Sequence, residues 1–99
     1  RGKIIENVVY NHLVFRGYVV KVGVLGDKEI DFIAEKKNEK IYVQVALTLD
    51  AEKTMEREFG NLLAIDDNYP KMVVTLNVFD GASYQGVKVV DLRSFLKTV

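Results

Sequence analysis

The sequence contains no cysteine and no tryptophan, and it carries no excess of either charge. Without cysteine, the chain can form neither a disulfide nor a thiolate metal site, and it has no cysteine nucleophile. Lysine and arginine together number 14, as do aspartate and glutamate, so the formal net charge is zero. Because a dedicated nucleic-acid-binding domain usually carries a basic surface, we expect DNA to be bound weakly if at all.

Long apolar runs and phosphate-binding loops are also missing. No apolar run approaches the roughly 20 residues of a membrane-spanning helix, and no signal peptide is visible, so the sequence predicts a cytoplasmic protein without membrane contact. The glycines occur singly, and no Walker-type nucleotide loop is present in these residues. The 99 residues suit one domain with its own core, and because the chain starts with RGKIIEN we expect it to be a piece of a longer protein.

Hydrophobic patterning divides the chain into helices and strands. We predict helices at Ile4–Arg16, Ala51–Ile65 and Arg93–Val99. β-Branched or alternating segments predict strands at Tyr18–Leu25, Glu29–Glu35, Lys40–Leu47, Met72–Leu76 and Val87–Leu92. Gly17 is placed to end the first helix, Asp50 to cap the second, and Asp80–Gly86 is predicted to be a loop. This order predicts an α/β domain with a central mixed sheet flanked by helices.

The second and third strands are joined by the short charged turn KKNE. Antiparallel pairing across this turn sets Glu35 opposite Lys40, and the same register sets Asp31 opposite Gln44 and Glu29 opposite Ala46. Strand alternation then predicts one face that carries these polar groups. The opposite face is predicted to be purely apolar and consists of Ile30, Phe32, Ala34, Ile41, Val43, Val45 and Leu47.

Two residues of the first predicted helix bear on a site. Glu6 lies at the border of the helix's apolar arc, from which its carboxylate can lean toward the sheet. His12 lies within that arc, and since the chain has no second histidine and no cysteine, we predict a packed side chain there and not a metal ligand.

These features together resemble a known superfamily. A helix with a glutamate, a glycine, a strand, then DFIAE, a basic turn and YVQVA resemble the PD-(D/E)xK nucleases, which have the restriction-endonuclease-like αβββαβ fold. The layout is also similar to that of archaeal-type Holliday-junction resolvases. More narrowly, NVVYNHLVFRGYVV, KEIDFIAE and AEKTMEREFGNLLAIDDNYPKMVV are similar to a bacterial and archaeal domain of unknown function at the C-terminus of AAA-type ATPases.

The resemblance implies a site whose chemistry is incomplete. Glu6 and Asp31 match the first two metal ligands of the superfamily, whereas Gln44 falls on the acid of E-x-K and Ala46 on its lysine. Glu29, opposite Ala46, is a candidate for a third metal-binding carboxylate. Mg²⁺ prefers carboxylate oxygens, and phosphodiester cleavage needs positive charge at the scissile phosphate. Glutamine removes one charge from the metal cage, and alanine cannot stabilise the phosphate. Lys53 is the candidate for a displaced lysine.

Three functions follow from this comparison. The leading one is a degenerate, non-catalytic domain without a cofactor, which serves an ATPase domain of the same chain, a protein partner or a second copy as an interaction or regulatory piece. The alternatives are a Mg²⁺-dependent DNA nuclease that uses Lys53, and a nucleic-acid-binding module that no longer cleaves. For Gln44 we favour a hydrogen-bonded amide over a metal ligand, because the side chain is neutral. For Asp31 the alternative is an ordinary ion-paired strand acid.

Overall fold

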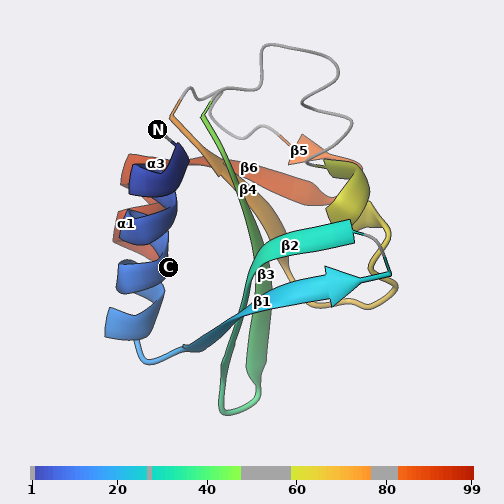
Figure 1. Cartoon of the computed structure of the whole chain (residues 1–99), viewed down its shortest axis with the longest axis horizontal. Helices are drawn as coiled ribbons and strands as arrows, with labels where there is room; N and C mark the ends of the chain where they lie inside the picture. Colours follow the sequence, from blue (N-terminus) through green and yellow to red (C-terminus); the bar gives the residue numbers. More distant parts are fainter. Residues whose placement is uncertain (1, 27, 48–58, 77–82) are drawn as a thin grey trace.

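The computed structural model of the chain describes residues 2–26, 28–47, 59–76 and 83–99. Its elements begin with helix α1 (Gly2–Phe15) and end with helix α3 (Leu92–Thr98), and residues 59–63 are helical between β3 and β4 (Figure 1). The strands are β1 (Val19–Leu25), β2 (Lys28–Lys36), β3 (Glu39–Ala46), β4 (Lys71–Thr75), β5 (Ser83–Tyr84) and β6 (Val87–Asp91). Each of these strands apart from β5 lies within one residue of the predicted bounds at both ends.

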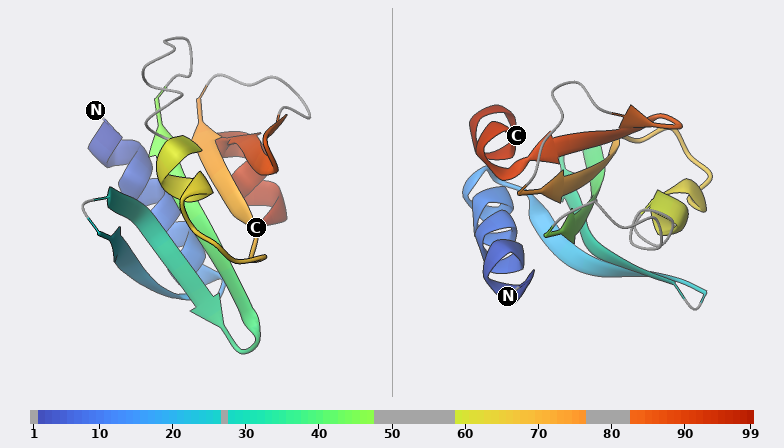
Figure 2. Two further views of the ribbon diagram at one scale, coloured as in Figure 1. Left: turned by 90° about the vertical axis from the view of Figure 1, so that its right-hand side faces the viewer. Right: turned by 90° about the horizontal axis from the view of Figure 1, so that it is seen from above.

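The described strands form one mixed sheet in the order β1-β2-β3-β4-β6-β5. The first three strands are an antiparallel meander, β4 and β6 run parallel to β3, and β5 pairs antiparallel with β6. Helices α1 and α3 cover one side of the sheet and the helical residues 59–63 lie on the other (Figure 2). The predicted α/β class with a mixed, helix-flanked sheet is confirmed. Among the helices that the structure describes, none is long and apolar enough to cross a membrane.

Helix α1 ends where the sequence predicts, and its end orients the first strand. Gly17 has φ of +96°, a conformation that suits glycine. The amide of Gly17 donates to the carbonyl of Val14, and that of Tyr18 donates to the carbonyl of Leu13. This pair of bonds is the Schellman arrangement, which satisfies the last carbonyls of a helix. The chain therefore turns sharply out of α1 into β1.

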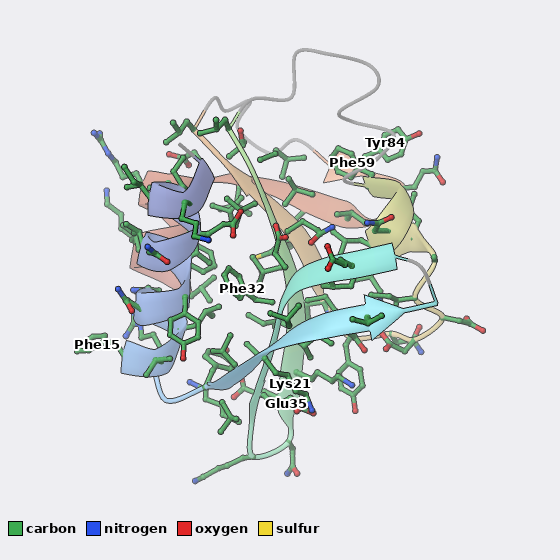
Figure 3. All side chains as sticks on the ribbon, viewed as in Figure 1. Phe15, Lys21, Phe32, Glu35, Phe59 and Tyr84 are labelled. Carbon is green, nitrogen blue, oxygen red and sulfur yellow. The ribbon has the colours of Figure 1, made fainter. Side chains whose placement is uncertain are left out.

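Strand β3 is buried on both faces and is the central strand of the core. Residues 41–46 of β3 are all buried. One apolar cluster joins α1 and α3 to the sheet through side chains such as Val9, Leu13, Phe32, Val43 and Phe95. A second cluster joins the helical residues 59–63 to the opposite face through Ile30, Tyr42, Ala46, Phe59, Leu62, Val73 and Val87. Figure 3 shows Phe32 beside α1 and Phe59 near Tyr84 on the other side of the sheet.

Two predictions about local structure need correction. The segment predicted as one loop includes β5, and Gln85 and Gly86, with φ of 49° and 89°, form the turn that returns the chain into β6. Two consecutive residues with positive φ are what a tight two-residue hairpin turn requires. Ile30 belongs to the second apolar cluster and not to the face of Phe32 and Ala34, so the predicted purely apolar face is wrong at this position.

Asp50, the predicted helix cap, and Lys53, the candidate displaced lysine, lie outside the described residues.

Candidate functional site

The β2–β3 hairpin has the register that the KKNE turn predicts. Glu35 pairs with Lys40, Ile33 with Tyr42 and Phe32 with Val43. The regular ladder ends at Phe32 and Val43, immediately before Asp31 and Gln44. The predicted site residues therefore lie where the two strands stop exchanging ordinary backbone pairs.

A β-bulge in β2 explains why the alternation fails at this point. Lys21 of β1 pairs with Ile33 and Gly23 pairs with Ile30, so two residues of β2, Asp31 and Phe32, lie opposite the single residue Val22. An extra residue in one strand shifts the side chains beyond it to the other face and opens the ladder locally. This shift places Ile30 on the face of the second cluster. Asp31, at the bulge, is not part of the regular ladder with β1 or with β3.

The side chain of Gln44 forms hydrogen bonds to β2 beyond the point where the regular ladder ends. Its side chain is only 2% exposed. The amide oxygen accepts a hydrogen bond from the backbone N–H of Asp31 at 2.5 Å, and the amide nitrogen donates to the backbone carbonyl of Glu29 at 3.3 Å. One neutral side chain thus provides both an acceptor and a donor to the neighbouring strand, as a backbone peptide group would. The predicted hydrogen-bonded amide is confirmed.

Asp31 makes the reciprocal contact. Its Oδ2 accepts a hydrogen bond from the backbone N–H of Val45 at 2.8 Å. The carboxylate therefore lies between the two strands, whereas Gln44 stands between the buried Tyr42 and Ala46 on the strand that they share. The predicted flat polar floor is replaced by a junction in which one side chain from each strand binds the backbone of the other. Within the described part of the chain, every buried polar side-chain atom has a hydrogen-bond partner.

A residue that the sequence did not single out completes this junction. Asn61, in the helical segment, donates from Nδ2 to the backbone carbonyl of Glu29 at 3.0 Å, so that carbonyl accepts from both Asn61 and Gln44. The bond ties the helix to the end of β2. The one signal for it in the sequence is a short amide side chain beside the apolar stripe of the predicted helix.

Burial and two acidic residues determine the electrostatics at Asp31. Burial raises the pKa of Asp31 above its ordinary value, against the lowering effect of the hydrogen bond from Val45. The charges of Glu6 and Glu29 raise the pKa of Asp31 further. Among the described residues, however, no three histidine, aspartate or glutamate side chains converge to hold a metal ion.

The position that the resemblance matches to a lysine, Ala46, is part of the core. Ala46 is 5% exposed and packs in the second apolar cluster with Ile30 and Phe59. Lys40, on the same strand, is engaged elsewhere, because its ammonium group lies over the rings of Tyr42 and Tyr69. The ammonium group of Lys40 therefore lies against these aromatic rings, and Lys53 is outside the described residues.

A second polar cluster lies at the opposite end of β3. Tyr42 donates its hydroxyl to Asp67 at 2.5 Å, and Lys71 forms an ion pair with the same carboxylate at 2.8 Å. Burial raises the pKa of Asp67, but bonds from Lys71, Tyr42 and the Tyr69 amide outweigh it and lower the pKa to about 2. Every group is paired within the cluster, so it fixes the segment before β4 and leaves no free reactive group there.

His12 also has the packing role that the sequence predicts. Its Nε2 lies 2.9 Å from the carbonyl oxygen of Val99, and its ring contacts that of Phe95 with 5.4 Å between centroids. The histidine therefore fastens α3 to α1.

The raised pKa of Asp31 predicts how a variant responds to pH. A folded pKa above the unfolded one means that protonated Asp31 favours folding. This contribution is complete below the unfolded pKa and lost as pH rises through the folded pKa. We therefore expect Asp31→Asn to be at least as stable as the wild type at neutral pH, and Asp31→Ala to be less stable because the Val45 amide loses its acceptor. Urea unfolding at neutral and acid pH measures this; equal destabilisation by both substitutions at neutral pH would contradict it.

Comparisons with known proteins give one relative and no family. No family description matches the chain. Over 92 residues the chain is 45% identical to an uncharacterized protein of Haemophilus influenzae. The match covers 93% of this chain but only 22% of the length of that protein. The relative is thus a considerably longer chain, and its name assigns no activity.

Proposed function

We propose that this chain is a degenerate PD-(D/E)xK nuclease-like domain that does not cleave nucleic acid. In this proposal it acts as an interaction or regulatory C-terminal domain of an AAA-type ATPase. The observation that carries the proposal is the hydrogen bonding of Gln44. Its amide uses one donor and one acceptor to join β2 to β3 at the position where the superfamily places a metal-binding acid.

Support for the nuclease-like fold comes from the arrangement of the elements. A helix, an antiparallel three-stranded meander, a further helix on the opposite face and a strand parallel to β3 follow one another in the order that the resemblance implies. The charge of Glu6 on α1 contributes to the raised pKa of Asp31 on β2, which agrees with the two positions that the resemblance matches to metal ligands. The restriction-endonuclease-like topology is therefore part of the proposal.

The proposed absence of cleavage rests on the groups that occupy the remaining two positions. Gln44 offers its oxygen to a backbone amide, so a metal ion would have to displace that bond and would gain no negative charge in return. Ala46 is packed in an apolar cluster and provides no cation for a phosphate. Removing one such stabilising group commonly costs about a hundred- to a thousand-fold in rate. With both missing we propose a domain whose role is contact and not chemistry.

The ATPase context rests on the narrower resemblance of the sequence to a domain of AAA-type ATPases. The length of the Haemophilus influenzae relative is compatible with it, since the matched region is 22% of that protein. In this arrangement the nucleotide site belongs to another domain, because the 99 residues contain no phosphate-binding loop.

A cleavage assay tests the proposal. We expect no Mg²⁺- or Mn²⁺-dependent cleavage of duplex, single-stranded or junction DNA by the purified chain, and no cleavage by Asp31→Ala. Cleavage by the wild type that is abolished both by chelator and by Asp31→Ala would contradict it. That result would favour a Mg²⁺-dependent nuclease, and Lys53→Ala would then ask whether Lys53 is its lysine.

A further inference from the structure

The two edges of the sheet differ in how well they are protected against pairing with another strand. On one edge lies β5, which has only two residues. On the other lies β1, which has seven residues of sequence VVKVGVL. Natural sheets usually blunt an exposed edge with a short strand, proline, several charges or a bulge. β1 has a single charged residue and no proline, and the extra residue of the bulge lies in β2.

The side chains of β1 are unusually exposed for an apolar strand. Val22 is 64% exposed and Val24 is 70% exposed. Figure 1 shows why: β1 leaves the last turn of α1 and runs away from that helix, so α1 does not cover its second half. Val20, nearer to α1, packs against the first apolar cluster. The outer half of β1 is therefore an apolar strand whose outer edge pairs with no other strand that the structure describes.

We propose that β1 is the interface between two copies of this chain, which pair antiparallel along β1 and join their sheets. Val22 is the middle residue of the strand, so a two-fold axis at Val22 lets all seven residues of each copy overlap. In this register Val20 lies opposite Val24 of the second copy and Val22 lies opposite itself. β-Branched residues that face each other across strands stabilise an antiparallel pair. The alternate valines of the sequence thus become one continuous apolar row.

The charges of the strand fit this register. Lys21 is the one charged residue of β1, and it lies opposite Gly23 of the second copy, so like charges do not face each other. Its ammonium group already forms an ion pair with Glu35 at 3.3 Å (Figure 3). A register centred on Lys21 would place two lysines face to face, which is unfavourable. The zero net charge of the chain adds no repulsion between copies. The proposal rests on the sheet edge and is independent of the function proposed above.

A charge at the axis tests the interface. By sedimentation equilibrium at about 0.1 mM chain we expect wild-type dimers, and Val22→Lys should be monomeric because two like charges would face each other. Phe15→Lys is the matched control, since Phe15 is 82% exposed on α1 and points away from the sheet (Figure 3). This control should remain dimeric. A monomeric wild type at this concentration overturns the proposal, as does a dimer lost in Phe15→Lys but kept in Val22→Lys.

Cysteine substitution tests the register itself, because the chain has no cysteine of its own. In Val22→Cys the two thiols face each other with Cα atoms about 4.5–5.5 Å apart, which a disulfide can bridge. In Lys21→Cys the two positions are diagonal, about 7–8 Å apart, beyond the usual reach of a disulfide. Mild oxidation should give a covalent dimer of the first variant at least tenfold faster than of the second. Equal rates, or faster coupling in Lys21→Cys, would overturn the register.

Discussion

Exchange of Gln44 for glutamate is expected to lower the free energy of unfolding by about 2–4 kcal/mol at neutral pH. The two side chains have nearly the same shape, so packing changes little. A carboxylate can still accept from the amide of Asp31, but it has no N–H to donate to the carbonyl of Glu29. It also adds a charge at a position that is 2% exposed, beside an acid whose pKa is already raised by burial and by neighbouring carboxylates.

Urea unfolding of Gln44→Glu measures this effect, and pH separates its two causes. A buried glutamate with a raised pKa disfavours the folded state when ionised, so the lost stability should partly return as pH falls. Gln85→Glu is the matched control, because it makes the same substitution at a residue in an exposed turn. We expect that control to stay within about 0.5 kcal/mol of the wild type. A Gln44→Glu variant as stable as this control would mean that the junction is open to solvent.

Exchange of Ala46 for lysine is expected to be similarly costly, by about 2–4 kcal/mol. The residue packs beside Ile30 and Phe59, where a longer side chain must displace apolar neighbours and its ammonium group must find a route to water. Ala64→Lys is the matched control at an exposed position. Thermal unfolding of both variants gives the comparison. If Ala46→Lys were tolerated as well as Ala64→Lys, position 46 would be accessible enough for a catalytic lysine.

The double variant Gln44→Glu with Ala46→Lys extends this result. Two opposite charges introduced two residues apart on one strand can pair, so the double variant should lose less stability than the two single losses combined. Its affinity for divalent metal should also exceed that of the wild type, with traces of cleavage if the backbone frame of the site is intact.

The hairpin that frames the site could be predicted from local sequence because its determinants are local. The charged turn fixed which residues of β2 and β3 face each other, and Glu35 and Lys40 pair as expected. The bulge could not be predicted in this way, because it depends on how β2 pairs with β1. It places Gly23 directly beneath Ile33, where any larger residue would collide with that side chain. The glycine of VVKVGVL is thus explained only by its neighbour in the sheet.

The polar residues likewise show which features depend on local sequence and which depend on a neighbouring strand. The neutral charge of Gln44 was enough to predict an amide that forms hydrogen bonds. Its partners were not predictable, because they are backbone groups exposed by the bulge. Asn61 and Asp67 were missed for a related reason. Asn61 bonds to the carbonyl of Glu29, and Asp67 accepts a bond from the hydroxyl of Tyr42, so each contacts a strand that is distant in the sequence. The local sequence around Asn61 indicates only the border of a helix, and that around Asp67 only a turn.

The unfolding midpoint of the wild-type chain in the presence of divalent metal tests the central claim most directly. A ligand that binds only the folded state raises the unfolding midpoint, and the rise grows with the ratio of ligand concentration to Kd. If Gln44 and Asp31 only join β2 to β3, the wild-type unfolding midpoint should be the same in millimolar Mg²⁺ or Mn²⁺ as in chelator. The midpoint of Asp31→Asn should be equally insensitive to metal. A midpoint that rises with Mn²⁺ in the wild type and not in Asp31→Asn would show a working metal site and contradict the account.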